Sequence, residues 1–139
     1  MQSLRRTVFW GRWLLLLVWL VGWPAAALAL NASQVFERVK NSVVVVRAYD
    51  RQWKQVGLGS GVVLPSGEVA TNHHVAASGV RLRVGARGKS VAATLIASDP
   101  ERDLALLHAP GLAATPARLG RAGALKVGDK VYAVGAPYG

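Results

Sequence analysis

Hydrophobic residues after position 41 follow the period of β-strands rather than that of helices. The first two runs are "SVVVVRAY" (42–49), which is rich in β-branched residues, and "KQVGLGSGVVL" (54–64), which is interrupted by glycines. Glycine inside a strand is typical of a bulge or of a close approach by another part of the chain. The turn sequence "PSG" (65–67) then predicts that "EVATN" (68–72) returns as the next strand of a hairpin.

The strand pattern continues through the rest of the chain. "VRLRV" (80–84) alternates, so Val80, Leu82 and Val84 are expected to face the core while the two arginines face solvent. Three more strand patterns follow, "KSVAATLIAS" (89–98), "DLALLHA" (103–109) and "KVYAVGA" (130–136). Six or seven short strands separated by turn signals predict an all-β fold, either a small antiparallel barrel or a sandwich.

The segment that precedes the strands has the pattern of a short helix. "ASQVFERVK" (32–40) places apolar residues at helical spacing after Ser33, which is a suitable N-cap residue. We therefore expect an N-terminal helical segment over residues 30–41.

Residues 1–29 have the composition of a secretory signal peptide. Basic residues precede the apolar run "WLLLLVWLVGW" (13–23), and Pro24 and an A-x-A sequence ending at Ala29 follow it. The alternative is an uncleaved membrane anchor, because the apolar stretch 13–30 is 18 residues long, which is near the minimum for a spanning helix. Both interpretations predict that the remainder of the chain is exported, and only the second places it on a membrane.

Cysteine content and charge narrow the class of protein. The chain contains no cysteine, so an exported domain must rest on its apolar core, as fits a bacterial periplasmic, cell-surface or secreted protein. Three of the 17 Lys and Arg residues lie in the first 29 positions, which leaves 14 against 7 Asp and Glu and a net charge of +7. These basic residues are scattered along the chain, which indicates a solvated basic surface rather than a nucleic-acid partner.

Two adjacent histidines, His73 and His74 in "TNHHVAAS" (71–78), are the first candidates for chemistry. Their position at a strand end also fits a structural role. Asp103 opens the apolar run "LALL", and a carboxylate at the start of a buried strand requires a partner, which either histidine can provide. A metal site that adds His108 to these three residues is disfavoured, because neighbouring strand residues point to opposite faces.

Three sequence blocks resemble those of trypsin-like serine proteases of the HtrA/Deg family. The blocks are "GLGSGVVLPSGEVATNHHV", "DPERDLALL" and "LKVGDKVYAVGAPYG", in the family's order and at similar separations. The resemblance implies the chymotrypsin-like two-barrel fold, of which residues 42–139 are the first, six-stranded antiparallel barrel. The second barrel lies outside this sequence.

The same resemblance implies a role for each matched residue. His74 is the general base, Asp103 orients it, and His73 occupies the variable position of the motif. The family's nucleophile block G-N-S-G-G is absent from the sequence, so the 139 residues by themselves are expected to be inactive. The family uses no cofactor or metal, acts on polypeptide substrates and often forms trimers. A non-catalytic barrel that serves as a binding module is the alternative function.

Overall fold

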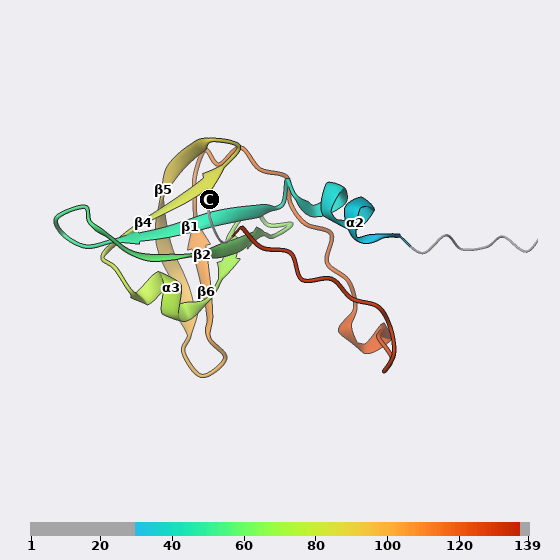
Figure 1. Cartoon of the computed structure of the whole chain (residues 1–139). Coiled ribbons are helices and arrows are strands. Elements are labelled where there is room, and N and C mark those ends of the chain that lie inside the picture. The colour runs from blue at the N-terminus through green and yellow to red at the C-terminus, as the bar shows by residue number, and fades with distance from the viewer. Residues whose placement is uncertain (1–29, 137–139) are drawn as a thin grey trace, which may run out of the picture.

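A closed barrel of six antiparallel strands dominates the computed structural model, which describes residues 30–136 (Figure 1). The strands are β1 (Val43–Tyr49), β2 (Gln55–Val63), β3 (Val69–Thr71), β4 (Arg81–Ala86), β5 (Lys89–Asp99) and β6 (Leu104–His108). Their order around the barrel is β1-β2-β3-β6-β5-β4, so that pairing of β1 with β4 closes the sheet. The predicted all-β fold with a six-stranded barrel is confirmed.

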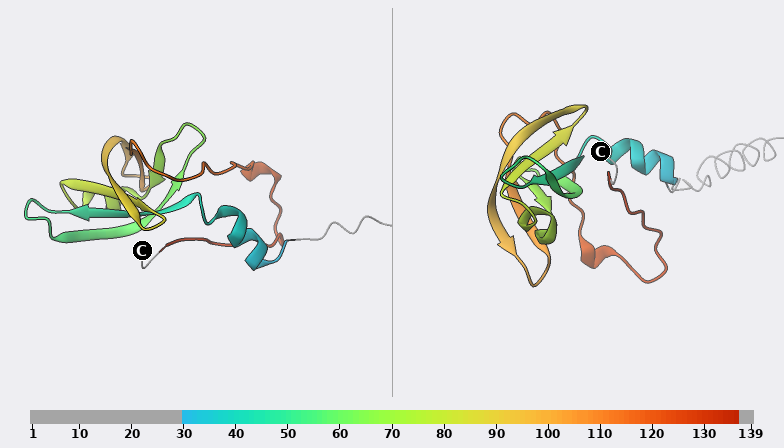
Figure 2. Two further views of the ribbon diagram at one scale, coloured as in Figure 1. Left: turned by 90° about the horizontal axis from the view of Figure 1, so that it is seen from above. Right: turned by 60° about the vertical axis from the view of Figure 1, so that its left-hand side comes forward.

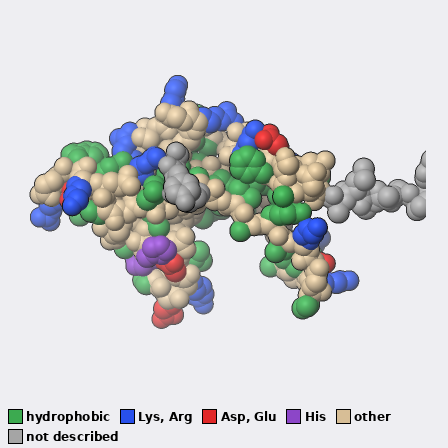
Figure 3. Space-filling model, in the orientation of Figure 1, with side chains coloured by type: hydrophobic (Ala, Val, Ile, Leu, Met, Phe, Trp, Pro, Cys, Tyr) green, Lys and Arg blue, Asp and Glu red, His purple; other side chains and the backbone are tan. Residues whose placement is uncertain are grey.

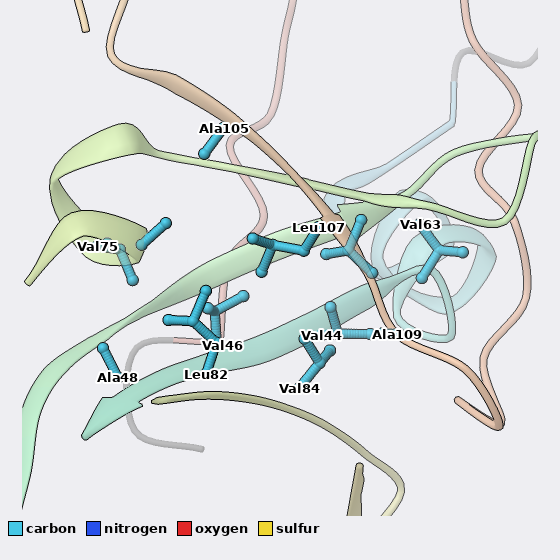
Figure 4. Packing of buried hydrophobic residues seen from close by; sticks show 12 residues of the cluster. Val44, Val46, Ala48, Val63, Val75, Leu82, Val84, Ala105, Leu107 and Ala109 are labelled. Carbon is cyan, nitrogen blue, oxygen red and sulfur yellow. The ribbon is translucent and has the colours of Figure 1, made fainter. Parts of the chain in front are cut away.

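Valine, leucine and alanine side chains fill the interior of the barrel (Figure 4). Val44, Val46 and Ala48 alternate along β1, as the strand period requires, and all three are buried. Leu107 on β6 is the largest of the fully buried side chains. A cluster of this kind supplies the apolar burial on which a cysteine-free domain depends.

Glycines in β2 let neighbouring side chains pack directly against its backbone. A Cβ at Gly59 would lie 2.6 Å from a methyl group of Val75, and one at Gly61 would lie 2.6 Å from a methyl group of Val69. Val75 belongs to a short helix, α3 (His73–Ala77), so the absence of a side chain at Gly59 seats this helix on the barrel. The expected close approach at these glycines is therefore found.

Gly79 lies shortly after α3, where the chain passes close to the backbone of Tyr49, and we expect Gly79→Ala to destabilise the domain. A Cβ there would lie 2.6 Å from the backbone oxygen and 2.7 Å from the backbone nitrogen of Tyr49, which cannot move as a side chain can. The expected loss is about 1–3 kcal/mol of unfolding free energy, measured by denaturant titration. Gly120→Ala is the control, because a Cβ at Gly120 meets no atom within 4 Å. Equal stability of the two variants would contradict this account.

The N-terminal helix is present, but its N-cap differs from the one expected. Helix α2 (Ala32–Val39) begins after Asn31, whose side chain accepts from the Gln34 backbone N–H while the Gln34 side chain accepts from Asn31 N–H, at 2.9 and 3.0 Å. This reciprocal capping box replaces the predicted cap at Ser33. The predicted signal peptide or anchor, residues 1–29, lies outside the described residues. Within residues 30–136, no helix is long and apolar enough to cross a membrane.

Residues 130–136 do not form the strand that their sequence pattern predicts. The six-stranded barrel is already closed, so "KVYAVGA" finds no free strand edge on it, and Val131 is 68% exposed. The segment that follows β6 instead leaves the barrel, forms the short 3₁₀ helix η1 (Ala122–Ala124) and runs back toward the barrel (Figure 2). There the Ala136 N–H donates to Ser60 Oγ at 2.8 Å.

Two smaller expectations also fail. Val80 was expected to face the core with Leu82 and Val84, but it precedes β4 and is 63% exposed. The histidine segment was expected to end a strand, whereas residues from His73 onward form α3. This helix has five residues, which is too short to produce a recognisable helical period in the sequence.

Candidate active site

The pairing of β3 with β6 brings the histidine segment next to Asp103. Thr71 lies opposite Ala105 in this antiparallel pair, so the residues after Thr71 run alongside the residues before Ala105. Helix α3 starts two residues after Thr71, and Asp103 lies directly before β6. His74 and Asp103 therefore meet although they are 29 positions apart.

His74 and Asp103 are joined by two hydrogen bonds. His74 Nδ1 lies 2.7 Å from Asp103 Oδ2, and the His74 backbone N–H donates to Asp103 Oδ1 at 2.9 Å. The side chains of His74 and Asp103 are 70% and 43% exposed, and Figure 3 shows histidine and acidic side chains together at the surface. Asp103 lies at the rim of the barrel, directly before β6, and His74 is its partner there.

The carboxylate determines which nitrogen of His74 carries the proton. Asp103 Oδ2 can only accept when ionised, so neutral His74 holds its hydrogen on Nδ1 and leaves Nε2 as an acceptor. Within residues 30–136, no side chain is hydrogen-bonded to Nε2. A ring with this tautomer and an accessible Nε2 can take a proton from a hydroxyl group.

Hydrogen bonds from His74 lower the pKa of Asp103 below its usual value. The largest contribution is the His74 backbone N–H, followed by the His74 side chain, and the Asn72 amide adds a smaller one. All of these donors stabilise the ionised carboxylate, which is the form that holds His74 in the tautomer described above.

The lowered pKa of Asp103 predicts how the stability of the domain changes with pH. Because the folded-state pKa is below the unfolded-state pKa, the contribution is present above the unfolded value and is lost as the pH falls through the folded value. We expect the difference in unfolding free energy between the wild type and Asp103→Asn to be constant above about pH 5 and to shrink as the pH falls below it. Denaturant titrations at several pH values measure it, and a difference that stays constant would contradict the assignment.

His73 points to a different partner from His74. Its Nδ1 lies 2.5 Å from Ser98 Oγ on β5, so it ties the start of α3 to that strand. The side chains of the two neighbouring histidines therefore point to different partners, as expected, but both residues lie in a helix and not in the predicted strand. No group of three or more His, Cys, Asp or Glu residues within 30–136 is arranged to hold a metal ion, and His108 lies apart beside Glu68.

Asn72 belongs to the site, although sequence reasoning assigned it no role. Its side-chain amide lies 3.1 Å from Asp103 Oδ2 and 3.3 Å from the Asp103 carbonyl oxygen. Asn72 was visible as part of the block "TNHHV", but nothing in the spacing of residues 72 and 103 reveals their contact.

Comparison with known proteins identifies the family. The family model for the trypsin-like peptidase domain matches residues 59–139, a segment that contains both His74 and Asp103. The chain belongs to the trypsin-like peptidase domain family. Helix α3 and the loop before β6 are therefore parts of a peptidase-type barrel.

Curated relatives place this peptidase domain near the HtrA/Deg branch. A probable periplasmic serine endoprotease, DegP-like, from Ectopseudomonas mendocina is 41% identical over 91 residues, which cover 64% of this chain and 19% of the relative. The protein of the same name from Pseudomonas putida is 40% identical over 92 residues. The chain thus spans about a fifth of the length of these relatives. The resemblance to the HtrA/Deg family is confirmed.

Solved structures agree with this placement. An HtrA-type protease, AlgW, with a bound tripeptide has a TM-score of 0.63 and 29% identity, over 72% of this chain and 33% of that protein. The active form of the Rv3671c protease from M. tuberculosis has a TM-score of 0.54 and 34% identity, over 59% of this chain and 36% of that protein. The peptidase domain described here therefore shares its barrel with proteases of this type.

Proposed function

We propose that the chain supplies the general base and the orienting carboxylate of an exported HtrA-type serine endopeptidase, which hydrolyses peptide bonds in unfolded or damaged proteins. The observation that carries the proposal is the contact of 2.7 Å between His74 Nδ1 and Asp103 Oδ2, on a chain of the trypsin-like peptidase family. The periplasmic names of the curated relatives support export.

In the proposed reaction, the two residues act together with a serine hydroxyl. His74 Nε2 takes the hydroxyl proton as the oxygen attacks the substrate carbonyl, and it then gives this proton to the leaving amine. Asp103 accepts from Nδ1–H throughout and stabilises the imidazolium that forms. Neither step needs a cofactor or a metal, and the proposed partner is a polypeptide substrate. We further propose, from the family resemblance, a trimeric assembly.

No serine hydroxyl among residues 30–136 is hydrogen-bonded to His74; Ser98 contacts His73 instead, and Ser60 lies on β2 beside Ala136. The proposal therefore needs a nucleophile in addition to the described residues. Purified chain 30–139 is expected to leave casein uncut, because a base and its carboxylate alone cannot form an acyl-enzyme. Turnover of casein by this segment would contradict the proposed division of roles.

A non-catalytic binding module is a second candidate. The observation in its favour is a relative without a protease name, the anti-sigma-I factor RsgI9 of Acetivibrio thermocellus, which is 33% identical over 115 residues. The DNA that follows the codon for Gly139 distinguishes the two functions. A reading frame that continues into a G-N-S-G-G or G-D-S-G-G motif supports the peptidase, whereas a stop codon supports the binding module.

A further inference from the structure

Asn72 occupies the N-cap position of α3, but its side chain does not cap the helix. Asparagine is among the preferred N-cap residues because its side-chain oxygen can accept from the N–H groups of the first turn. The Asn72 side chain makes no such bond, and it reaches instead to Asp103, 31 positions away. Both atoms that it contacts there, Oδ2 and the carbonyl oxygen, are acceptors, so the amide nitrogen must be the group that faces them.

The Asp103 carboxylate fills the place that the Asn72 oxygen leaves empty. His74 is the second residue of α3, and its backbone N–H, which an N-cap side chain normally satisfies, donates to Asp103 Oδ1 at 2.9 Å. The helix is thus capped by a distant carboxylate, while the local asparagine binds that same carboxylate. Asp103 thus caps α3 in place of Asn72, and the Asn72 amide gives the Asp103 carboxylate a hydrogen-bond donor in addition to those of His74.

This additional donor restrains a side chain that packing does not hold in place. The Asp103 side chain is 43% exposed, so packing does not lock its rotation. Its backbone has a φ of +53°, in the left-handed region that residues other than glycine adopt at some cost. The Asn72 amide bonds both the carbonyl oxygen of this unusual backbone and the oxygen that accepts from His74 Nδ1.

We propose that Asn72 is a positioning residue for the His74–Asp103 pair, and that it acts by holding Asp103 Oδ2 toward His74 Nδ1. The proposal rests on the proposed function for its catalytic meaning, since it assigns Asn72 to the orientation of the general base. The contact itself can be tested without any catalysis. Asn72 has no part in the proposed proton transfer.

The test is a titration of the Asp103 carboxyl carbon by ¹³C NMR in the full chain, with the wild type compared with Asn72→Ala and Asn72→Ser. Removal of the amide takes a donor from the ionised carboxylate, so the Asp103 midpoint is expected to move to higher pH in both variants. Asp99 and Arg102, the charged groups in the adjoining turn, bond each other at 2.7 Å, and Glu101 lies exposed in the same turn. They remain unchanged across the series.

Asn72→Ser separates positioning from helix capping. Serine is as good an N-cap as asparagine, but its shorter side chain cannot span the distance to Asp103. If Asn72 served only the helix, the serine variant would behave as the wild type, and this result would overturn the proposal, as would an unchanged midpoint in Asn72→Ala. Should the alanine variant fail to fold, Asn72→Asp keeps the shape of the side chain, replaces the donor with a second carboxylate and is also expected to raise the midpoint.

A kinetic measurement completes the test in a form of the protein that carries the nucleophilic serine. Misplacement of the carboxylate should lower kcat for peptide hydrolysis by roughly 10- to 100-fold, with little change in KM because Asn72 is not proposed to touch substrate. A shifted midpoint with unchanged kcat would overturn the positioning role. Absence of any cleavage by the wild type would instead count against the proposed function, so the two failures are distinguishable.

Discussion

His74→Ala and Asp103→Asn are each expected to lower the rate of casein cleavage by about 10⁴-fold in a form of the protein that carries the nucleophilic serine. Without His74, no group takes the hydroxyl proton. With asparagine at position 103, the amide can donate to the ring and favours the wrong tautomer, so Nε2 carries the hydrogen and can no longer act as a base. The rates are measured with unfolded casein at neutral pH.

His73→Ala is the matched control for this experiment. His73 is the chain neighbour of His74, but its ring contacts Ser98 on β5 rather than Asp103. The variant is expected to retain most of the activity and to lose only the stability that this contact contributes. If His73→Ala abolished cleavage while His74→Ala had no effect, the assignment of the general base would be wrong by one residue. Thermal melts of all three variants separate loss of catalysis from loss of folding.

Leu107→Ala is expected to destabilise the domain by about 2–5 kcal/mol. Leu107 lies on β6 with 0% exposure, and its side chain belongs to the buried cluster inside the barrel (Figure 4). Truncation removes buried methyl groups and leaves a cavity that a closed sheet cannot collapse to fill. Because β6 also follows Asp103, the same variant is expected to loosen the site. Denaturant unfolding measures the change.

Leu104→Ala on the same strand is the control for the core prediction. Leu104 is 52% exposed at the start of β6, so its truncation removes little buried surface. We expect its effect to be well below that of Leu107→Ala. Similar losses for the two variants would show that the stability of β6 does not depend on the barrel interior in the way described.

Much of the barrel is predictable from local sequence. The β-branched run in β1 and the alternation of Leu82 with Val84 in β4 determine which residues can face a core. The turn at 65–67 is equally local, and Gly67 adopts a φ of +93° there. The prediction for Val80 was wrong because alternation does not show at which residue a strand begins. The position of Val80 is instead determined by the hydrogen bond from its N–H to the Tyr49 carbonyl oxygen.

The candidate site was only partly accessible from the sequence. The family motifs pointed to His74 and Asp103, and the structure places the two side chains in contact. The apolar residues that follow Asp103 indicated that its carboxylate needs a partner but left open which histidine supplies it, because the sequence does not show that the His73 ring contacts Ser98 instead. The contact of Asn72 with Asp103 could not be inferred, because an asparagine before a helix ordinarily caps that helix.

The sequence by itself determined the strand class, the positions of the turns and the residues able to fill a core, because these depend on side-chain alternation and backbone preference within a few positions. Only the tertiary structure decided which strands pair, why "KVYAVGA" is not a strand of this barrel, and that Asn72, His74 and Asp103 converge. Each of these depends on hydrogen-bond partners supplied by distant parts of the chain. Because the barrel is closed, residues 130–136 have no strand edge with which to pair. The register of β3 against β6 places Asp103 beside the first turn of α3.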